Sequence, residues 1–167
     1  MRVTVYNIYK TKWGGGAVLF RDQKLVGLLF PEKNRSYLEA QIYERFGEVT
    51  FSKDVGNELC NKLSNYFKGQ KADFLDIKID LDWATDLEKQ IYQNLRKVPA
   101  GITVSYRELA IMCGKPNGAR AVGNAMAKNR IPVVIPCHRV LKSDGSLGGW
   151  SGKTRWKEML LKIEGVK

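Results

Sequence analysis

The pattern of apolar residues changes near residue 83, and this change limits the chain to a fold built from two different halves. Before this point, apolar and polar residues alternate as in β-strands, in residues 1–10, 17–20, 25–30 and 74–81. Two helices are predicted over residues 36–46 and 57–67, where apolar residues recur every three or four positions. Three consecutive glycines at residues 14–16 predict a turn or loop. The first half is therefore expected to be a small α+β module.

The second half carries the apolar spacing of helices. Helices are predicted over residues 85–97, 106–113, 118–128 and 154–164. Thr85 and Ser105 stand where N-caps are expected, and Glu108 completes a capping box with Ser105. The turn at residues 114–117 separates two short helices, which is a helix-turn-helix pattern. In the last helix the expected buried stripe consists of Trp156, Leu160 and Ile163.

The full chain has a net charge of +11, and this positive charge is concentrated in its second half. Residues 1–85 hold 13 Lys/Arg and 11 Asp/Glu, while residues 86–167 hold 15 Lys/Arg and 6 Asp/Glu. This asymmetry indicates a polyanion site on the second half, although charge alone fits simple solubility equally well. No apolar stretch reaches the roughly 20 residues of a membrane helix, and residues 1–10 lack the pattern of a signal peptide. A soluble intracellular protein is therefore expected.

The three cysteines and the single histidine limit the possible chemistry. An odd number of cysteines argues against a disulfide framework, and one histidine without a CxxC motif argues against a structural zinc site. Cys60 and Cys113 lie at helical spacings that are typical of small core residues. Cys137 differs from them because His138 follows it directly.

Cys137 and His138 form a candidate pair of nucleophile and base. A thiol with a pKa near 8.5 is mostly protonated at neutral pH, and a base or a cationic setting raises its thiolate fraction. Arg139 is expected to supply positive charge, while Pro132 and Pro136 stiffen the loop that presents the thiol. By itself, a Cys–His pair is more often a buried cysteine beside a surface histidine, because adjacent side chains usually point apart.

Three motifs in the second half carry more information than this pair alone. They are Ile135-Pro136-Cys137-His138-Arg139-Val140, the upstream Val104-Ser105-Tyr106 and the intervening Ala119-Arg120-Ala121-Val122-Gly123. In their order and spacing they strongly resemble the O6-alkylguanine-DNA alkyltransferase family, from about Leu87 to Glu164. The first half is similar to that family only in size and coarse pattern. The resemblance implies an α+β fold with a small ribonuclease-H-like N-terminal supporting domain, residues 1–82. It also implies a mainly helical C-terminal domain with a helix-turn-helix, residues 83–167, that binds DNA and accepts the alkyl group.

The resemblance implies catalytic roles for five residues. Cys137 is similar to the alkyl acceptor, and His138 is similar to the histidine that acts on it through a bound water. Glu164 matches the glutamate that orients this histidine, although without the resemblance it would be an exposed charge at a helix end. Asn129 matches an asparagine that braces the active-site loop. Tyr106 matches a tyrosine that crowds the phosphate beside the target nucleotide and contacts the guanine, and it is the candidate proton donor.

Two further sets of residues are implied in the same way. The DNA-contacting set consists of Ser105, Tyr106, Ala119, Arg120 and Gly123, with Arg120 filling the gap that the extruded base leaves. Small side chains such as Ala119 and Gly123 let a helix backbone approach a groove. The pocket for the substrate base consists of Tyr106, Val140, Trp150 and Ser151. The chain departs from the family at Trp150, where tyrosine is common, and at Asn124, where many members have glycine.

The function implied by the resemblance is direct-reversal DNA repair. Such a protein flips O6-alkylguanine out of duplex DNA and transfers the alkyl group irreversibly to Cys137, once per molecule. We expect a monomer that binds double-stranded DNA, without a membrane partner, cofactor or metal, in the cytoplasm or in a eukaryotic nucleus. Two alternatives are a non-catalytic helix-turn-helix damage sensor, whose class replaces the acceptor cysteine, and a thiol hydrolase that uses Cys137 and His138.

Overall fold

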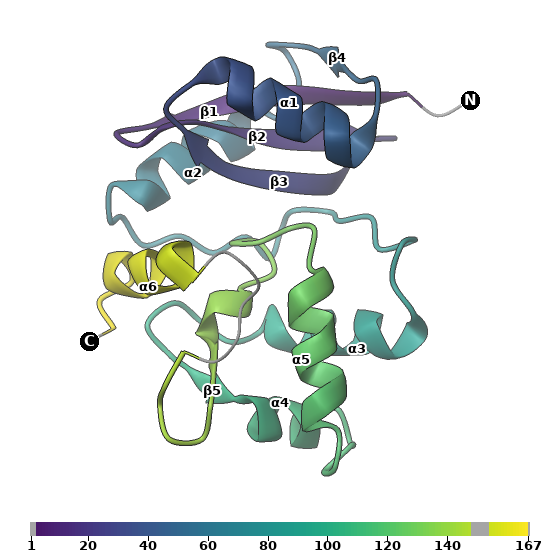
Figure 1. Ribbon diagram of the computed structural model, residues 1–167, viewed down its shortest axis with the longest axis vertical. Helices are drawn as coiled ribbons and strands as arrows, with labels where there is room; N and C mark the ends of the chain where they lie inside the picture. Colours follow the sequence, from purple (N-terminus) through teal and green to yellow (C-terminus); the bar gives the residue numbers. More distant parts are fainter. Residues whose placement is uncertain (1–2, 148–153, 167) are drawn as a thin grey trace. The chain divides into compact units, whose positions relative to one another are not determined.

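The chain forms two compact units, one built on a sheet and one built mainly from helices (Figure 1). A computed structural model describes residues 3–147 and 154–166. The first unit comprises residues 1–72 and 76–80, and the second comprises residues 73–75 and 81–167. The architecture is α+β, which confirms the predicted fold class. Among the described helices, none is both long and apolar enough to cross a membrane.

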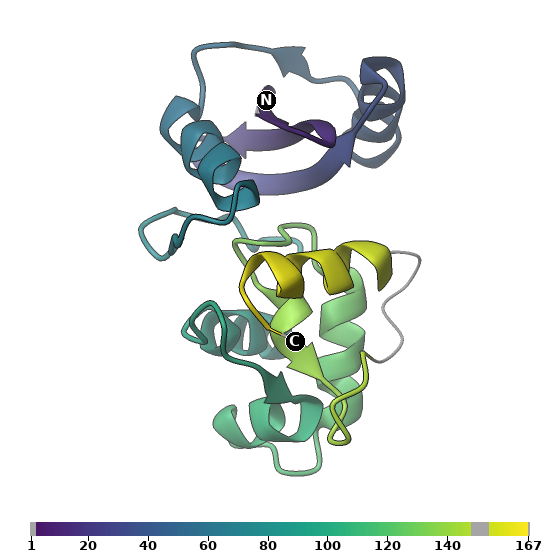
Figure 2. The ribbon, with the colours of Figure 1, turned by 90° about the vertical axis from the view of Figure 1, so that its left-hand side faces the viewer.

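In the first unit, two helices cover opposite faces of a four-stranded sheet (Figure 2). The strands are β1 (Thr4–Thr11), β2 (Gly14–Arg21), β3 (Lys24–Glu32) and β4 (Thr50–Phe51), in the order β3-β2-β1-β4. β1 and β3 are antiparallel to β2, while β4 is parallel to β1. The helices are α1 (Arg35–Phe46) and α2 (Asn57–Phe67). Because side chains alternate along β1, Tyr6 packs with Leu38 and Ile42 of α1, while the Tyr9 ring stacks on Phe67 of α2.

The three consecutive glycines belong to β2, so the prediction of a turn at residues 14–16 is wrong. Gly16 pairs with Tyr9 across the sheet, and a Cβ atom on Gly16 would lie 2.1 Å from the Tyr9 ring. Gly14 has a φ of +116°, and a Cβ atom there would meet the backbone of Glu32. Glycine is needed here for close approach within the sheet, and the turn falls at residues 12–13 instead.

The strand predicted for residues 74–81 is also wrong. Within this segment, which the structure describes in full, Ile79 alone pairs, in an isolated bridge with Leu25 of β3. Upstream, the Asp73 carboxylate accepts a hydrogen bond from the Leu75 amide at 3.3 Å, and a turn follows. A local hydrogen bond between side chain and backbone therefore replaces an extended start of the segment.

The second unit contains helices α3 (Asp86–Leu95), α4 (Tyr106–Met112), α5 (Ala119–Lys128) and α6 (Thr154–Ile163). Thr85 and Ser105 cap α3 and α4 in full capping boxes, as the sequence predicts. Two short parallel strands pair in this unit: β5 (Val104–Ser105) directly precedes α4, and β6 (Val140–Leu141) directly follows a single 3-10 turn. They place the start of α4 beside this turn, η1 (Cys137–Arg139), on which α6 packs.

The buried face of α6 differs from the predicted stripe. Leu160 is buried as expected, but Trp156 and Ile163 are only partly buried. The buried positions are instead Lys157, Leu160 and Leu161. The apolar pattern missed this face because it contains a lysine, whose charge argues against burial unless a site requires it.

Candidate active site

The loop before Cys137 is held in one conformation by the side chain of Asn129. Asn129 ends α5; its Nδ2 donates to the Ile135 carbonyl, and its Oδ1 accepts from the Ile131 amide, both at 2.9 Å. Within this loop Val133 has a φ of +72°, which is strained for a β-branched residue and costs about 1–3 kcal/mol. The hydrogen bonds of Asn129 and the buried valines compensate for that strain. The loop thus presents η1 on a rigid support, with the Cys137 side chain buried.

Tyr92 supports the same region from α3. Its buried hydroxyl donates to the Ala125 carbonyl of α5 at 2.6 Å. At the end of α5 the Asn129 amide donates to the Met126 carbonyl and not to the Ala125 carbonyl. The Tyr92 hydroxyl therefore donates to a buried carbonyl that does not accept the Asn129 amide. Burial raises the pKa of Tyr92 well above its ordinary value, and the charge on Glu88 adds to this effect. No sequence pattern predicts this role, because Tyr92 lies on an ordinary core face of α3.

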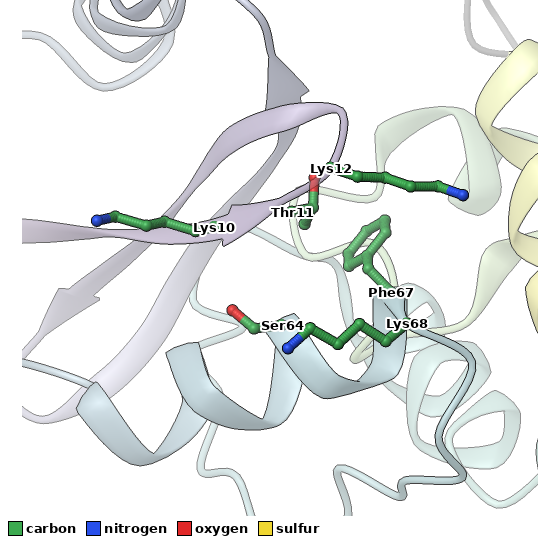
Figure 3. Close-up of a pocket in the computed structure, with 6 residues that line it drawn as sticks. All are labelled: Lys10, Thr11, Lys12, Ser64, Phe67 and Lys68. Carbon is green, nitrogen blue, oxygen red and sulfur yellow. The ribbon is translucent and has the colours of Figure 1, made fainter.

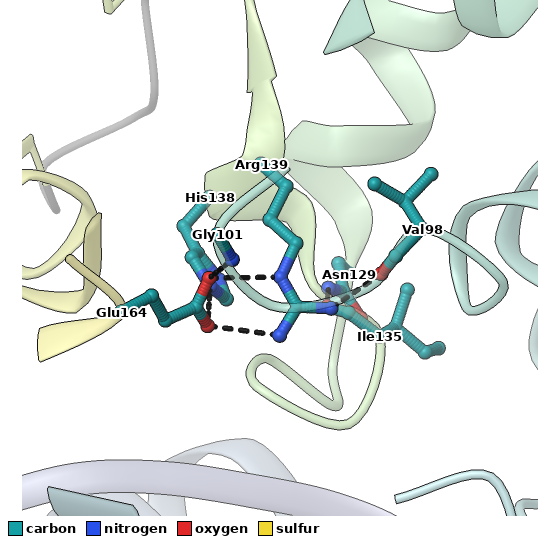
Figure 4. A network of polar contacts seen from close by, with 7 residues as sticks. All are labelled: Val98, Gly101, Asn129, Ile135, His138, Arg139 and Glu164. Atoms are coloured by element: carbon teal, nitrogen blue, oxygen red, sulfur yellow. Dashed lines mark hydrogen bonds and ion pairs between the residues drawn. The ribbon is translucent and has the colours of Figure 1, made fainter. Parts of the chain in front are cut away.

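His138, Glu164 and Arg139 form a buried polar network (Figure 4). His138 Nε2 lies 2.6 Å from Glu164 Oε2, and the Arg139 guanidinium donates to both carboxylate oxygens at 2.9 Å. Arg139 also donates to the Val98 carbonyl. The Glu164 side chain is 1% exposed, so it is not the surface charge that its position at a helix end suggests. The Arg139 guanidinium pairs with Glu164, so this carboxylate balances its charge, and its expected contribution to the cationic setting of the thiol stays a prediction.

The protonation states of this network follow from its burial. Burial lowers the pKa of His138, and the hydrogen bond from its ring to Glu164 opposes that shift only in part. Burial would raise the pKa of Glu164, but hydrogen bonds from His138 and Arg139 together hold it below its ordinary value. At neutral pH the ring is therefore neutral, donates its Nε2 proton to the carboxylate and keeps a lone pair on Nδ1. Nδ1 is buried and has no hydrogen-bond partner among the described residues.

Lys157 is the functional residue that the motifs did not reveal. It is fully buried, and its Nζ lies 3.5 Å from the Tyr106 hydroxyl and 5.6 Å from the centre of that ring. Burial lowers the pKa of Lys157 to about 8, while the negative charge of the Cys137 thiolate opposes the shift. A signal was available in the sequence, because Lys157, Leu160, Leu161 and Glu164 share one helical face.

Tyr106 is the first residue of α4, and the charge of Cys137 acts on its hydroxyl. Burial raises the pKa of its hydroxyl, and the negative charge of Cys137 raises it further. The phenol therefore remains protonated and can donate a hydrogen bond or a proton. The geometry brings together a thiol, a neutral imidazole, a cation and a phenol from η1, α6 and α4.

The remaining predicted residues lie on α5, beside the cluster on β5 and β6, or outside the described part. Arg120 is exposed on α5, and a Cβ atom added to Gly123 would have open space around it. Ser105 is buried, with its hydroxyl capping α4, and Val140 is fully buried. Trp150 and Ser151 lie outside the described residues. Among described side chains, no group of three or more His, Cys, Asp or Glu could hold a metal ion.

Comparison with known proteins gives this arrangement a family. Residues 86–166 match the model described as 6-O-methylguanine DNA methyltransferase, DNA binding domain. The methylated-DNA–protein-cysteine methyltransferase of Metallosphaera sedula is 36% identical over 160 residues, which span 96% of this chain and 92% of that protein. The chain belongs to this methyltransferase family. The corresponding protein of Methanosarcina barkeri is 41% identical over 113 residues, covering 68% of this chain and 70% of that protein.

Solved structures of the methyltransferase family extend the likeness to both units. A variant of Mycobacterium tuberculosis O6-methylguanine methyltransferase superposes with a TM-score of 0.81 at 30% identity, covering 97% of this chain and 93% of that chain. A structure of the same protein in complex with DNA has a TM-score of 0.78 at 29% identity, with 96% and 92% coverage. The family match at residues 86–166 includes every residue of the buried cluster around Cys137.

Proposed function

We propose that this chain repairs duplex DNA by transferring an alkyl group from O6 of guanine to Sγ of Cys137, once per molecule. The observation that carries the proposal is the buried set of Cys137, His138 and Glu164, together with the contact between Lys157 and Tyr106, both of which couple electrostatically to Cys137. A damage sensor would have no use for a nucleophile with this support, and the chain keeps the cysteine. The family membership points to the same activity.

The first step is formation of the thiolate. Because His138 donates Nε2–H to Glu164, its Nδ1 is the basic atom, and it takes the thiol proton through one bridging water. Arg139 keeps Glu164 ionised, so the carboxylate stabilises the imidazolium that forms. Lys157 stabilises the thiolate by its positive charge in a setting of low dielectric constant.

The second step is transfer of the alkyl group. The thiolate attacks the alkyl carbon in line with the bond to O6; the S–C bond forms as the C–O6 bond breaks. The electron pair of the broken bond passes to guanine, and the Tyr106 hydroxyl supplies a proton to the departing base. Lys157, at 3.5 Å, can return a proton to that hydroxyl. The product is a thioether, which these residues have no means of cleaving, so each molecule reacts once.

DNA engagement is assigned to α4 and α5, which we interpret as a helix-turn-helix. The exposed Arg120 and the open surface at Gly123 suit a helix that enters a groove and fills the gap left by an extruded base. Extrusion costs a few kcal/mol, and less for a modified base that pairs poorly. We infer a monomer that needs no cofactor and acts where the genome is located, in the cytoplasm or in a eukaryotic nucleus.

The first unit is interpreted as a ribonuclease-H-like supporting domain. Three antiparallel strands, a helix and a fourth strand parallel to the first support this interpretation. Its residues contribute none of the groups in the buried cluster around Cys137.

The test is intact-protein mass spectrometry after incubation with a duplex that contains O6-methylguanine. We expect a gain of about 14 Da, one methylene, in a single modification on Cys137. A Cys137→Ser variant should bind the duplex but gain no mass. An unchanged mass of the wild type together with salt-sensitive DNA binding would exclude transfer and favour the damage sensor.

A further inference from the structure

A groove lies in the first unit between the end of β1 and the helix α2 (Figure 3). Its volume is about 550 Å³, and it is lined by Lys10, Thr11, Lys12, Ser64, Phe67 and Lys68. All of these residues belong to the first unit. The alkyl-transfer chemistry uses none of them, so the groove requires an explanation of its own.

The floor of the groove is rigid. Phe67 is 3% exposed, its ring stacks on Tyr9 with 5.7 Å between centroids, and the Trp13 ring meets its edge at 6.0 Å. The Thr11 hydroxyl donates to the Gly14 carbonyl and accepts from the Trp13 amide, which fixes the turn after β1. The groove is therefore formed before any ligand arrives, which lowers the entropic cost of binding.

The walls carry positive charge without a negative counterpart. Lys12 Nζ lies 4.7 Å from the centre of the Trp13 ring, while Lys68, the C-cap of α2, comes four residues after Ser64. Among the described residues, no carboxylate lines the groove. Within the described part of the chain, Lys10, Lys12 and Lys68 form no ion pair, whereas Lys62 on the same helix pairs with Asp76 at 3.1 Å. Such a surface attracts an anion.

The arrangement of the lysines indicates the shape of that anion. Lys10 and Lys12 extend in different directions from the end of β1, and Lys68 runs along α2 toward the Ser64 hydroxyl (Figure 3). Charges that spread along a groove suit an extended chain of repeated negative groups better than one compact ion. Duplex DNA carries one negative charge per about 1.7 Å of its axis, and lysines neutralise its phosphates without reading sequence.

We propose that this groove binds backbone phosphates of duplex DNA through Lys10, Lys12 and Lys68, with the Ser64 hydroxyl as a further donor. The first unit then contributes directly to DNA affinity, independently of the alkyl-transfer step. Binding here adds a term that depends on salt and not on damage, because no group in the groove is placed to distinguish one base from another.

The test compares two triple variants of the full chain that lose equal charge. The groove variant is Lys10→Gln/Lys12→Gln/Lys68→Gln, and the control is Lys24→Gln/Lys33→Gln/Lys53→Gln, whose lysines are exposed on the same unit outside the groove. Fluorescence anisotropy gives the affinity for an undamaged duplex across a series of salt concentrations. Each lost phosphate contact lowers the slope of log affinity against log salt by about 1. We expect a decrease of about 2–3 for the groove variant and none for the control.

An equal change in the salt slope of the two variants would overturn the proposal, because the lost net charge alone would then explain the change. Lysine-selective chemical labelling of the wild type provides a second measurement that does not depend on variant folding. DNA should protect Lys10, Lys12 and Lys68 but not Lys24; protection by inorganic phosphate alone would reassign the groove to a small anion. Transfer from a free O6-alkylguanine base should be unchanged in both variants, so this result is distinct from failure of the proposed function.

Discussion

The two units place positive charge in opposite environments. Within residues 3–80 every lysine and arginine is at least partly exposed, whereas the second unit buries Arg139 and Lys157. Removing a cation from water costs several kcal/mol unless partners compensate for it. The Glu164 carboxylate compensates Arg139, whereas burial lowers the pKa of Lys157 to about 8, and only the negative charge of Cys137 opposes that shift. The second unit thus buries a cation that couples electrostatically to Cys137, while the first keeps its cations exposed to solvent.

The strongest test of this contrast is Glu164→Gln. The variant leaves the buried Arg139 guanidinium without its carboxylate, so we expect the free energy of unfolding to fall by about 3–5 kcal/mol. Urea denaturation measures it. Glu158→Gln changes an exposed carboxylate on the same helix and should stay within about 0.5 kcal/mol of the wild type. A loss below about 1 kcal/mol for Glu164→Gln would mean that the ion pair between Arg139 and Glu164 does not stabilise η1.

Gly16→Ala tests the other side of the contrast, because the first unit depends on close packing. The added methyl group would overlap the Tyr9 ring, so we expect a loss of about 2–3 kcal/mol. Transfer from a free O6-alkylguanine base should persist under native conditions. The double variant Tyr9→Leu/Gly16→Ala should lose less unfolding free energy than the two single variants lose together. Strict additivity would show that the tyrosine ring is not what requires glycine here.

Lys157→Met should separate stability from chemistry. Replacing an incompletely compensated charge by an apolar side chain is often neutral or stabilising, so we expect unfolding to be unchanged or harder. Transfer should slow by about tenfold or more, since the thiolate loses a nearby cation. Single-turnover kinetics with a free O6-alkylguanine base measure the rate, and Lys162→Met, exposed on the same helix, should match the wild type. A normal rate in Lys157→Met would remove the lysine from the mechanism.

A last expected effect is a pH dependence of the difference between wild type and Lys157→Met. The pKa of Lys157 is about 8 in the folded chain and has an ordinary value of 10.5, so between these values the unfolded chain binds more protons. The stability of the wild type should therefore rise relative to the variant as pH increases from about 8 to about 10. Denaturation curves at several pH values measure it, and a constant difference would show that the ammonium titrates normally.

Local signals in the sequence predicted structure well wherever neighbouring residues decide it. The caps at Thr85 and Ser105 and the ends of α2 depend on groups within a few positions, and the structure has them. The glycines at residues 14–16 were wrongly predicted as a turn because their necessity comes from Tyr9 and Glu32, which are close only in the folded sheet. Contacts of that kind leave no mark on local composition.

The same distinction applies to the candidate site. The motifs around Cys137 pointed to His138, Glu164 and Asn129 through a resemblance, and the structure brings Glu164 to the histidine ring. The motifs did not point to Lys157, because apolar periodicity favoured Trp156 for the same helix. Arg139 lies two residues after the thiol in sequence yet pairs with Glu164, because the 3-10 turn at residues 137–139 directs successive side chains to different sides.

The short pairing of β5 with β6 has a mechanical consequence. Four residues of strand fasten the first turn of α4 to the segment that leaves η1, with Val104 opposite Val140 and Ser105 opposite Leu141. Because the two strands are paired, a displacement of β5 carries β6 with it, so the distance between the start of α4 and η1 stays constant. A nucleotide that approaches the protein therefore meets a site whose dimensions are already set, and the chain does not need to move to adjust them.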